Sequence, residues 1–247
     1  MNPKILFEQV PDGDGTWIMS LMSGLKFTLI VAALAWIVAF TLGSILGVLR
    51  TTDRKWVVRL GDAYVELFRN IPLIVQFFVW FFVLPGLFLP VKHLVNSLDP
   101  LTYQLIASVV CLGTFTAARI AEQVRAGIQA LPRGQRYAGY AMGLTQAQTY
   151  RYVLLPVAYR IIIPPLTSEL MNLIKNTAVG YSIGLVELFF RTREMGELTF
   201  RYFEAFAAAT VIYVVIAMIA NRIMAFIEKR TAIPGFISGA GAGAGGH

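Results

Sequence analysis

The sequence predicts an all-α membrane protein with five transmembrane helices, and three observations lead to that prediction. Of its 247 residues, 57% are hydrophobic and only 14% are charged, and the mean hydropathy is +0.65. A soluble globular domain carries about 25% charged residues. Uncharged runs recur along the chain, and basic residues gather between alternate runs. Together these features indicate a single domain that lies within a lipid bilayer.

The first three spans follow from uncharged runs near the length of about 20 residues that a membrane helix needs. Phe27–Leu49 is bracketed by Lys26 and Arg50, and no small-residue cleavage site follows it, so we interpret it as an anchor rather than a signal peptide. Asn70–Val91 and Pro100–Ala118 are the next two runs. Helices buried in a large soluble core are the alternative, but such long uncharged runs are rare there.

The last two spans complete the predicted domain. Ile161–Val186 carries only Glu169 and Lys175 as charges, and Ala205–Asn221 carries none. The expected span bounds are 24–49, 65–91, 100–121, 157–186 and 203–224. Around them we expect an outer N-terminal segment 1–19, a membrane domain 20–230 with a long polar loop 122–156, and a flexible Gly/Ala-rich tail 231–247.

The orientation is predicted by the distribution of lysine and arginine. Segments 50–59, 119–160 and the end of the last span hold thirteen of them, whereas the segments on the opposite side hold five. Basic residues favour the cytoplasmic side. We therefore expect the N-terminus outside and the C-terminus in the cytoplasm, with a charge-balanced outer loop at 187–204.

Several function classes are excluded by the residues present. The chain has two histidines and one cysteine, Cys111, which lies within a span, so neither a disulfide framework nor a metal site is expected. No motif of a protease, hydrolase or phosphate-binding loop occurs. The net charge of +7 is divided among the loops rather than clustered as a nucleic-acid-binding surface would require. We expect no catalytic residues in this chain.

Polar side chains inside the spans are the candidates for a functional site, because ionisable groups are costly in a bilayer and usually face a cavity or a partner. Glu169, Asn172 and Asn176 are spaced to share one helical face, with Lys175 beside them. Pro164 and Pro165 precede this group and predict a broken helix. The predicted substrate-path residues are Arg69, Gln76, Arg119, Glu169, Asn172, Lys175, Asn176 and Thr177. The alternatives are structural pairing of Glu169 with Lys175, and Arg69 and Arg119 as cations that extend to the membrane surface.

The polar loop carries a recognisable pattern. Its stretch RYAGYAMGLTQAQTYRYVLLP, residues 136–156, resembles the cytoplasmic loop of permease subunits of ABC importers, which follows EAA, three residues, Gly, nine residues, Ile, one residue, Leu-Pro. Here Tyr137-Ala138-Gly139, Gly143, Val153 and Leu155-Pro156 occupy those places, with Tyr137 where the pattern has Glu.

The resemblance implies a type I ABC importer permease fold, in which this loop is a coupling helix that docks onto an ATPase. The residues it assigns to coupling are Gly134, Tyr137, Ala138, Gly139, Gly143, Leu144 and Pro156.

Other segments resemble the polar amino acid branch of this family. They include FRNIPLIVQ at 68–76, AARIAEQVRAGIQALPRGQ at 117–135 and RIIIPPLTSELMNLIKNTA at 160–178, and several phrases closely resemble glutamate/aspartate permeases. Many relatives have Tyr in place of Arg119 and Asp in place of Asn176, and both differences make the site more positive. A planar guanidinium pairs well with a carboxylate. The resemblance therefore implies an acidic amino acid, with Glu169 on its ammonium and Arg119 or Lys175 on a carboxylate.

The resemblance also implies the partners: a second, homologous permease or a second copy of this chain, two ATP-binding subunits, a periplasmic binding protein and the bacterial inner membrane. ATP and magnesium would be bound by the ATPase, and this chain would need no cofactor. Three alternatives stay open: an importer for glutamine or a cationic amino acid, an ion-driven secondary transporter, and a channel or membrane scaffold. A secondary transporter usually has an internal inverted repeat, and none is evident.

Overall fold

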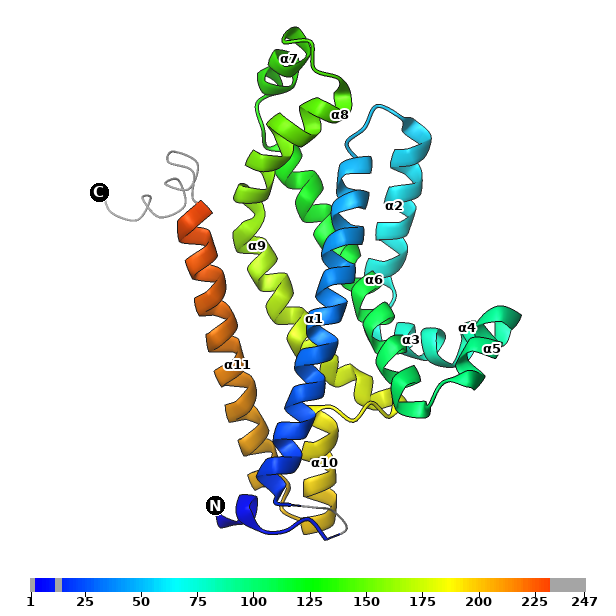
Figure 1. The fold of residues 1–247 in the computed structure, drawn as a ribbon, viewed down its shortest axis with the longest axis vertical. Helices are drawn as coiled ribbons and strands as arrows, with labels where there is room; N and C mark the ends of the chain where they lie inside the picture. The colour runs from blue at the N-terminus through cyan, green and yellow to red at the C-terminus, as the bar shows by residue number, and fades with distance from the viewer. Residues whose placement is uncertain (1–2, 12–14, 232–247) are drawn as a thin grey trace.

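The computed structural model describes residues 3–11 and 15–231, and the regular elements in these ranges are helices (Figure 1). The predicted tail 231–247 lies outside the described residues except for Thr231. The elements are η1 (Pro3–Phe7), α1 (Trp17–Leu49), α2 (Lys55–Asn70), α3 (Leu73–Phe78), η2 (Val79–Val83), α4 (Leu84–Leu87), α5 (Leu89–Ser97), α6 (Pro100–Gln129), α7 (Arg133–Ala141), α8 (Gln146–Thr149), η3 (Tyr150–Leu154), α9 (Leu155–Asn176), η4 (Thr177–Ile183), α10 (Leu188–Thr199) and α11 (Tyr202–Thr231).

The predicted all-helical membrane architecture is confirmed at the level of four or five candidate spans. Four helical segments are long and apolar enough to cross a bilayer: Trp17–Leu49, Pro100–Gln129, Gln146–Ile183 and Tyr202–Thr231. A fifth candidate consists of Lys55–Asn70 and Leu73–Leu87, which meet at 105°. Half or less of each span's most apolar window is buried within the chain. Much apolar surface is therefore left for lipid or for other subunits.

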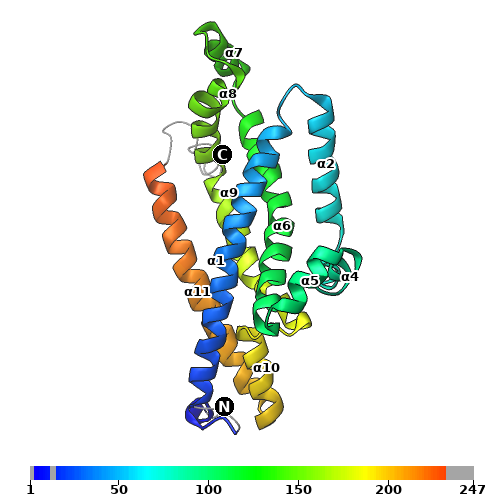
Figure 2. The same ribbon diagram turned by 45° about the vertical axis from the view of Figure 1, so that its right-hand side comes forward.

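Helices α1 and α6 form the centre of the molecule and run side by side (Figures 1 and 2). Glycines allow their backbones to approach. A Cβ atom at Gly43 would lie 2.7 Å from the Cβ of Ile120, and one at Gly47 would lie 2.6 Å from the Cβ of Val124. Gly113 is in equally close contact with Val38. These small residues convert two long helices into one tightly packed pair.

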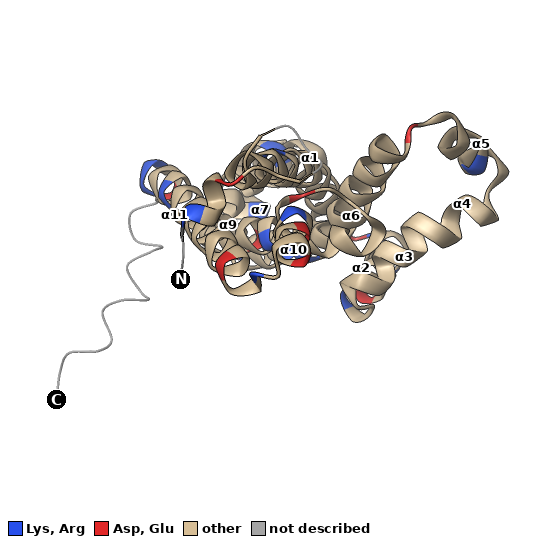
Figure 3. Cartoon of the chain, turned by 90° about the horizontal axis from the view of Figure 1, so that it is seen from below, with Lys and Arg blue, Asp and Glu red and all other residues tan. Residues whose placement is uncertain are grey.

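The bend between α2 and α3 lies within the second expected span, 65–91. Ile71, which precedes Pro72, is extended (φ −89°, ψ 128°), because a proline disfavours the helical conformation of the residue before it. The amide of Gln76 donates hydrogen bonds to the carbonyls of Phe68 and Ile71, at 2.9 Å each, and so satisfies backbone groups at the break. Beyond it, α3 to α5 form an arm that extends sideways (Figure 3).

The prediction of a broken helix at Pro164 and Pro165 was wrong. Helix α9 continues through both prolines, and Thr167 donates a hydrogen bond back to the Ile163 carbonyl at 3.1 Å. The irregular turns lie at the ends of the span instead. The wide turn η3 precedes Pro156, and the tight turn η4 follows Asn176. Pro156 lies inside the continuous helical segment Gln146–Ile183, and the wide turn η3 occurs where proline cannot donate a backbone hydrogen bond.

Two ends of the molecule can be distinguished. The loop 50–54 and helices α7 and α8 lie together at one end, whereas the N-terminal segment and α10 lie at the other (Figure 1). The sequence predicted a loop at 187–204, but α10 occupies most of this segment and packs against α1 and α11. Its apolar residues Leu188 and Met195 are fully buried, which explains why it forms a helix there.

Candidate functional site

An acidic and a basic side chain face each other between α6 and α9 without forming an ion pair. Glu169 on α9 interacts electrostatically with Arg119 on α6 and with Arg69 at the end of α2. The Oε2 atom of Glu169 and the Nε atom of Arg119 are both buried without a hydrogen-bond partner among the residues that the structure describes. The Arg119 guanidinium lies 5.0 Å from the ring centre of Phe115. The structure thus brings together three of the predicted substrate-path residues and leaves two charged groups able to accept a polar ligand.

Arg69 lies on the open side of this group. Its side chain is 53% exposed, and its Nη1 atom is 3.8 Å from Oε1 of Glu122. An exposed pair at this distance is weak. Arg69 is therefore free to turn between Glu122 and Glu169.

The other predicted substrate-path residues divide into two groups. Gln76 and Thr177 are buried and bonded to backbone: Gln76 at the α2–α3 bend, and Thr177 to the Ile174 carbonyl at 2.8 Å. Asn172, Lys175 and Asn176 lie along α9 and its end, with Lys175 exposed and both asparagines partly exposed. Asn172 and Asn176 thus extend the Glu169 face of α9, whereas the bonds of Gln76 and Thr177 stabilise turns.

A buried arginine outside the predicted set joins three helices just after α1. The Arg50 side chain is 3% exposed, and it donates to Asp62 of α2 and to Glu122 of α6, both at 2.7 Å. Burial lowers the pKa of Arg50, but the two hydrogen bonds and the two negative charges outweigh this effect and raise it above its usual value. Arg125 adds a longer contact to Asp62 at 3.9 Å. The guanidinium therefore stays charged and ties α1, α2 and α6 together.

The predicted coupling residues form a compact helical segment, α7–α8, at the end of the molecule. Gly143 has φ of +79°, a left-handed conformation that favours glycine at the end of a helix, and its N–H donates to the Tyr140 carbonyl at 2.9 Å. A Cβ atom at Gly139 would lie 2.7 Å from Cγ2 of Thr149, so glycine allows α7 to contact α8. The positive φ at Gly143 and the close contact at Gly139 explain why glycine occupies each position.

The outer face of this segment is exposed and partly apolar. Tyr137 is 66% exposed and Met142 is 80% exposed, at the tip of the molecule. Gly134 and Ala138 are exposed, Leu144 is partly buried, and Pro156 follows the wide turn η3 into α9. Thr145 and Gln148 form a reciprocal capping box that starts α8. The segment is therefore rigid within itself and presents an open surface.

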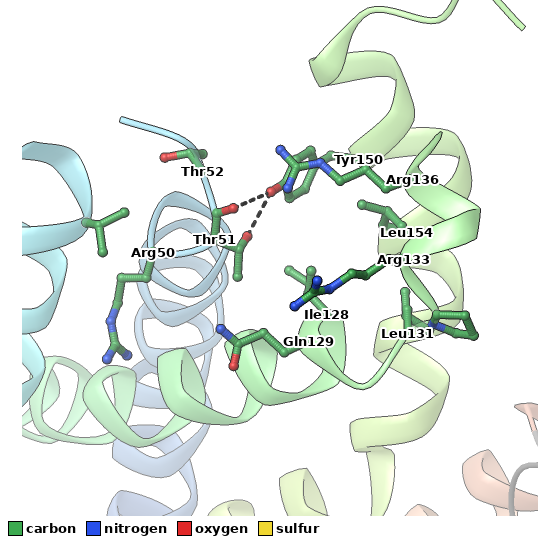
Figure 4. A pocket seen from close by; sticks show the side chains of 12 residues that line it. Arg50, Thr51, Thr52, Ile128, Gln129, Leu131, Arg133, Arg136, Tyr150 and Leu154 are labelled. Atoms are coloured by element: carbon green, nitrogen blue, oxygen red, sulfur yellow. Dashed lines mark hydrogen bonds between the residues drawn. The ribbon is translucent and has the colours of Figure 1, made fainter. Parts of the chain in front are cut away.

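A cavity of about 490 Å³ lies between this segment and the loop after α1 (Figure 4). Tyr150 donates to the Thr51 carbonyl at 2.8 Å across its edge, and Arg136 bonds to Asp53 at 2.8 Å. The pKa of Arg136 is raised by its hydrogen bond to Tyr140 more than burial lowers it, with Asp53 adding to the rise. The loop after α1 and the α7–α8 segment are thus in direct contact.

A buried carboxyl group lies toward the opposite end. Glu187 is fully buried and precedes α10, where it accepts from the Phe190 N–H at 2.8 Å. Thr28 of α1 and Tyr213 of α11 are longer partners, each at 3.4 Å. Burial raises the pKa of Glu187 to about 7, despite the hydrogen bonds that lower it.

Sequence reasoning missed Arg50, Asp53 and Glu187 as structural or functional positions. Arg50 was interpreted only as a cytoplasmic marker, and its partner Glu122 lies 72 residues away. Asp53 and Arg136 are separated by 83 residues. The one available signal was the pair of acidic residues, Asp62 and Glu122, in segments that were otherwise basic or apolar.

Comparison with known proteins gives consistent matches over most of the chain. The family model described as "Binding-protein-dependent transport system inner membrane component" matches residues 39–233. The glutamate/aspartate import permease protein GltJ of Escherichia coli (strain CFT073) is 47% identical over 96% of this chain and 98% of its own length. GltK of the same strain, also a glutamate/aspartate import permease protein, is 31% identical over 86% of this chain and 93% of its own.

A solved structure is similar as well. It is described as an amino acid ABC transporter with histidines, and its matching chain superposes with a TM-score of 0.71 at 27% identity, over 87% of this chain and 95% of that one.

Proposed function

Because the chain belongs to the family of binding-protein-dependent transport system inner membrane components, it is a multi-pass inner membrane permease subunit of an ABC importer for amino acids, and we propose that it carries glutamate and aspartate. The chain is not itself an enzyme, since the family lacks the ATPase domain. The similarity to GltJ supports the acidic substrates. Glutamate and aspartate each carry one ammonium group and two carboxylates, so their recognition needs one anionic and at least one cationic group.

The observation that carries the proposal is the unpaired arrangement of Glu169 and Arg119. Each has a buried polar atom without a partner, although their charges are opposite and their helices pack together. Buried polar atoms of this kind are costly unless a ligand or water satisfies them. In our proposal Glu169 binds the ammonium group of the substrate, and Arg119 binds a carboxylate. Arg69, Asn172, Lys175 and Asn176 complete the path, whereas Gln76 and Thr177 position its turns.

We assign the end that bears α7 and α8 to the cytoplasm, with five spans and the N-terminus outside. The basic residues of 50–59 and of 119–160 support this orientation. The exposed face of α7 around Tyr137 and Met142 would dock onto an ATPase subunit, which binds ATP and magnesium. A periplasmic binding protein would deliver the amino acid on the opposite side.

The partner permease in this proposal is a different, GltK-like chain rather than a second copy. One strain has two distinct glutamate/aspartate permease proteins, and this chain is 47% identical to one and 31% identical to the other. This difference supports an unequal pair, in which each half contributes its own side chains to the path.

The proposal is tested by uptake of labelled glutamate in cells with and without this chain, in the presence of excess aspartate, glutamine or arginine. We expect uptake to require the chain, to be inhibited by aspartate and to be unaffected by arginine. Arg119→Ala should reduce glutamate uptake by about tenfold or more, because a charge-assisted bond to the substrate is lost. Arg59→Ala, which changes an exposed cation of α2 outside the path, is the matched control. Competition by arginine or glutamine instead would contradict the acidic assignment.

A further inference from the structure

We propose that the loop after α1, residues 50–54, is a second coupling element. Asp53 within the loop and Tyr150 of η3 are the residues that hold it in position. Through their contacts, movement of the α7–α8 segment would reach α1 and α2. This inference rests on the proposed role of the segment in docking an ATPase. We use the name clasp for two sets of contacts: those of Asp53 with Arg136 and Gln146, and those of Tyr150 with Thr51.

Asp53 forms the first half of the clasp. Its Oδ2 atom accepts from Nη2 of Arg136 at 2.8 Å and from Nε2 of Gln146 at 3.3 Å. Arg136 belongs to α7 and Gln146 to α8. One carboxylate therefore holds both helices of the segment to the loop.

Tyr150, the first residue of η3 after α8, forms the second half. Its hydroxyl donates to the Thr51 carbonyl at 2.8 Å and lies 3.0 Å from the Thr51 hydroxyl (Figure 4). The Tyr150 side chain is buried, and the Arg136 guanidinium lies 5.9 Å from its ring centre. The two halves of the clasp thus share Arg136, which lines the 490 Å³ cavity together with Thr51 and Tyr150.

The clasp adds a direct link to those that the backbone and helix packing provide. The α7–α8 segment continues directly from α6 and into α9, so its movement is passed to those helices by the backbone. Helices α1 and α2 have no backbone connection to the segment except through α6, and α1 is otherwise reached by its packing against α6 and α9. The clasp holds Thr51 and Asp53 in the loop that joins α1 to α2. Arg50, the residue before Thr51, bonds to Asp62 and Glu122. A push on the segment would therefore move α1, α2 and α6 together.

The exposure of Asp53 distinguishes a coupling role from a purely structural one. The Asp53 side chain is 77% exposed, and exposed ion pairs add little to folding stability. Removing its carboxylate should leave the fold intact and weaken only the mechanical link. A residue of this kind affects the coupling of two events more than the stability of the protein.

The test uses the assembled importer in proteoliposomes, with its ATPase, partner permease and binding protein. The readout is the amount of amino acid imported per ATP hydrolysed, normalised to the amount of assembled complex. We expect Asp53→Ala to lower this ratio by about twofold to thirtyfold, the range for residues within a coupling network. Tyr150→Phe should lower it less, and Asp53→Glu should preserve it. Glu66→Ala, which changes an exposed carboxylate of α2 outside the clasp, is the matched control.

An unchanged ratio in Asp53→Ala would overturn the proposal, as would a fall that Asp53→Glu shares or that Glu66→Ala reproduces. Loss of assembled complex in Asp53→Ala would also overturn it, because the residue would then be structural. The ratio is measured with whichever amino acid the wild type imports. If that amino acid is arginine, the glutamate assignment fails while the clasp is still tested.

Discussion

Arg50 and Glu187 are both buried ionisable residues that join three helices, but their environments differ in kind. Arg50 bonds to two carboxylates, Asp62 and Glu122, at 2.7 Å each. Glu187 bonds to a backbone N–H and to the hydroxyls of Thr28 and Tyr213, all of them neutral. The nearby cation Arg191 pairs with Glu194 instead.

The difference shows that hydrogen bonds alone do not keep a buried group charged. Counter-charges outweigh the burial of Arg50, and its pKa rises, so that it remains a cation. Burial prevails at Glu187, whose pKa rises to about 7, so that its carboxyl group gains a proton near neutral pH. One end of the molecule is therefore held by fixed charges and the other by a group that titrates.

The largest effect is expected from Arg50→Met. It leaves Asp62 and Glu122 without their shared cation. Removal of one partner from a fully buried ion pair costs about 3–5 kcal/mol, and we expect the lower end of this range because both carboxylates are about one-third exposed. We expect a large fall in the thermal unfolding midpoint of the purified chain in detergent or nanodiscs. Arg54→Met, which removes an exposed cation four residues on, is the control and should change little. Equal midpoints for the two variants would show that the buried charges are not essential to the three-helix junction.

A smaller, pH-dependent effect is expected from Glu187→Gln. The carboxyl group ionises near 4.5 in the unfolded chain and at about 7 when buried, so the folded protein holds more protons between these values. The free energy of unfolding should therefore fall as pH rises from about 4.5 to 7, by about 3 kcal/mol from this one group. Glutamine does not ionise, so it makes no such pH-dependent contribution to the free energy of unfolding.

The measurement for Glu187→Gln compares unfolding midpoints of variant and wild type at pH 5 and pH 8. The variant should be the more stable protein at pH 8 and should differ little at pH 5. Glu66→Gln sets the baseline for loss of an exposed carboxylate. A difference that is the same at both pH values would mean that Glu187 does not titrate in this range.

The smallest effect is expected from Glu197→Gln. Glu197 forms an ion pair with Arg193 on the surface of α10, where both side chains are substantially exposed. Such i,i+4 pairs contribute about 0.3–0.5 kcal/mol. The unfolding midpoint should shift by only a degree or two, and less at high salt. A shift as large as that of Arg50→Met would show that burial does not explain the difference between the two regions.

The sequence was sufficient for the architecture, because span length and charge depletion are dictated by the bilayer. Uncharged runs at 27–49 and 205–221 correspond to α1 and α11. The bend after Asn70 was not predicted, although Pro72 lies within the quoted segment 68–76. Whether proline breaks a helix depends on which groups can replace the lost bonds, and at Pro164 the helix continued.

The candidate site was predicted only in part, because the bonds of a polar side chain depend on groups that lie far away in the sequence. Single residues such as Arg119 and Glu169 stand out because they are charged within apolar runs. Gln76 stood out equally, but the structure commits its amide to the α2–α3 bend. Pairings such as Asp53 with Arg136 cannot be inferred from one sequence, since nothing in the local pattern specifies a partner 83 residues away.

The glycine contacts between α1 and α6 have a practical consequence for spectroscopy of the working transporter. Two helices packed this closely at Gly43, Gly47 and Gly113 cannot slide without steric overlap or separate without losing packing contacts, so we expect them to move as one rigid body. Paired spin labels on the exposed faces of α1 and α6 should give a distance that stays constant through the transport cycle. That distance is an internal ruler against which displacements of α9, α11 and the α3–α5 arm can be measured.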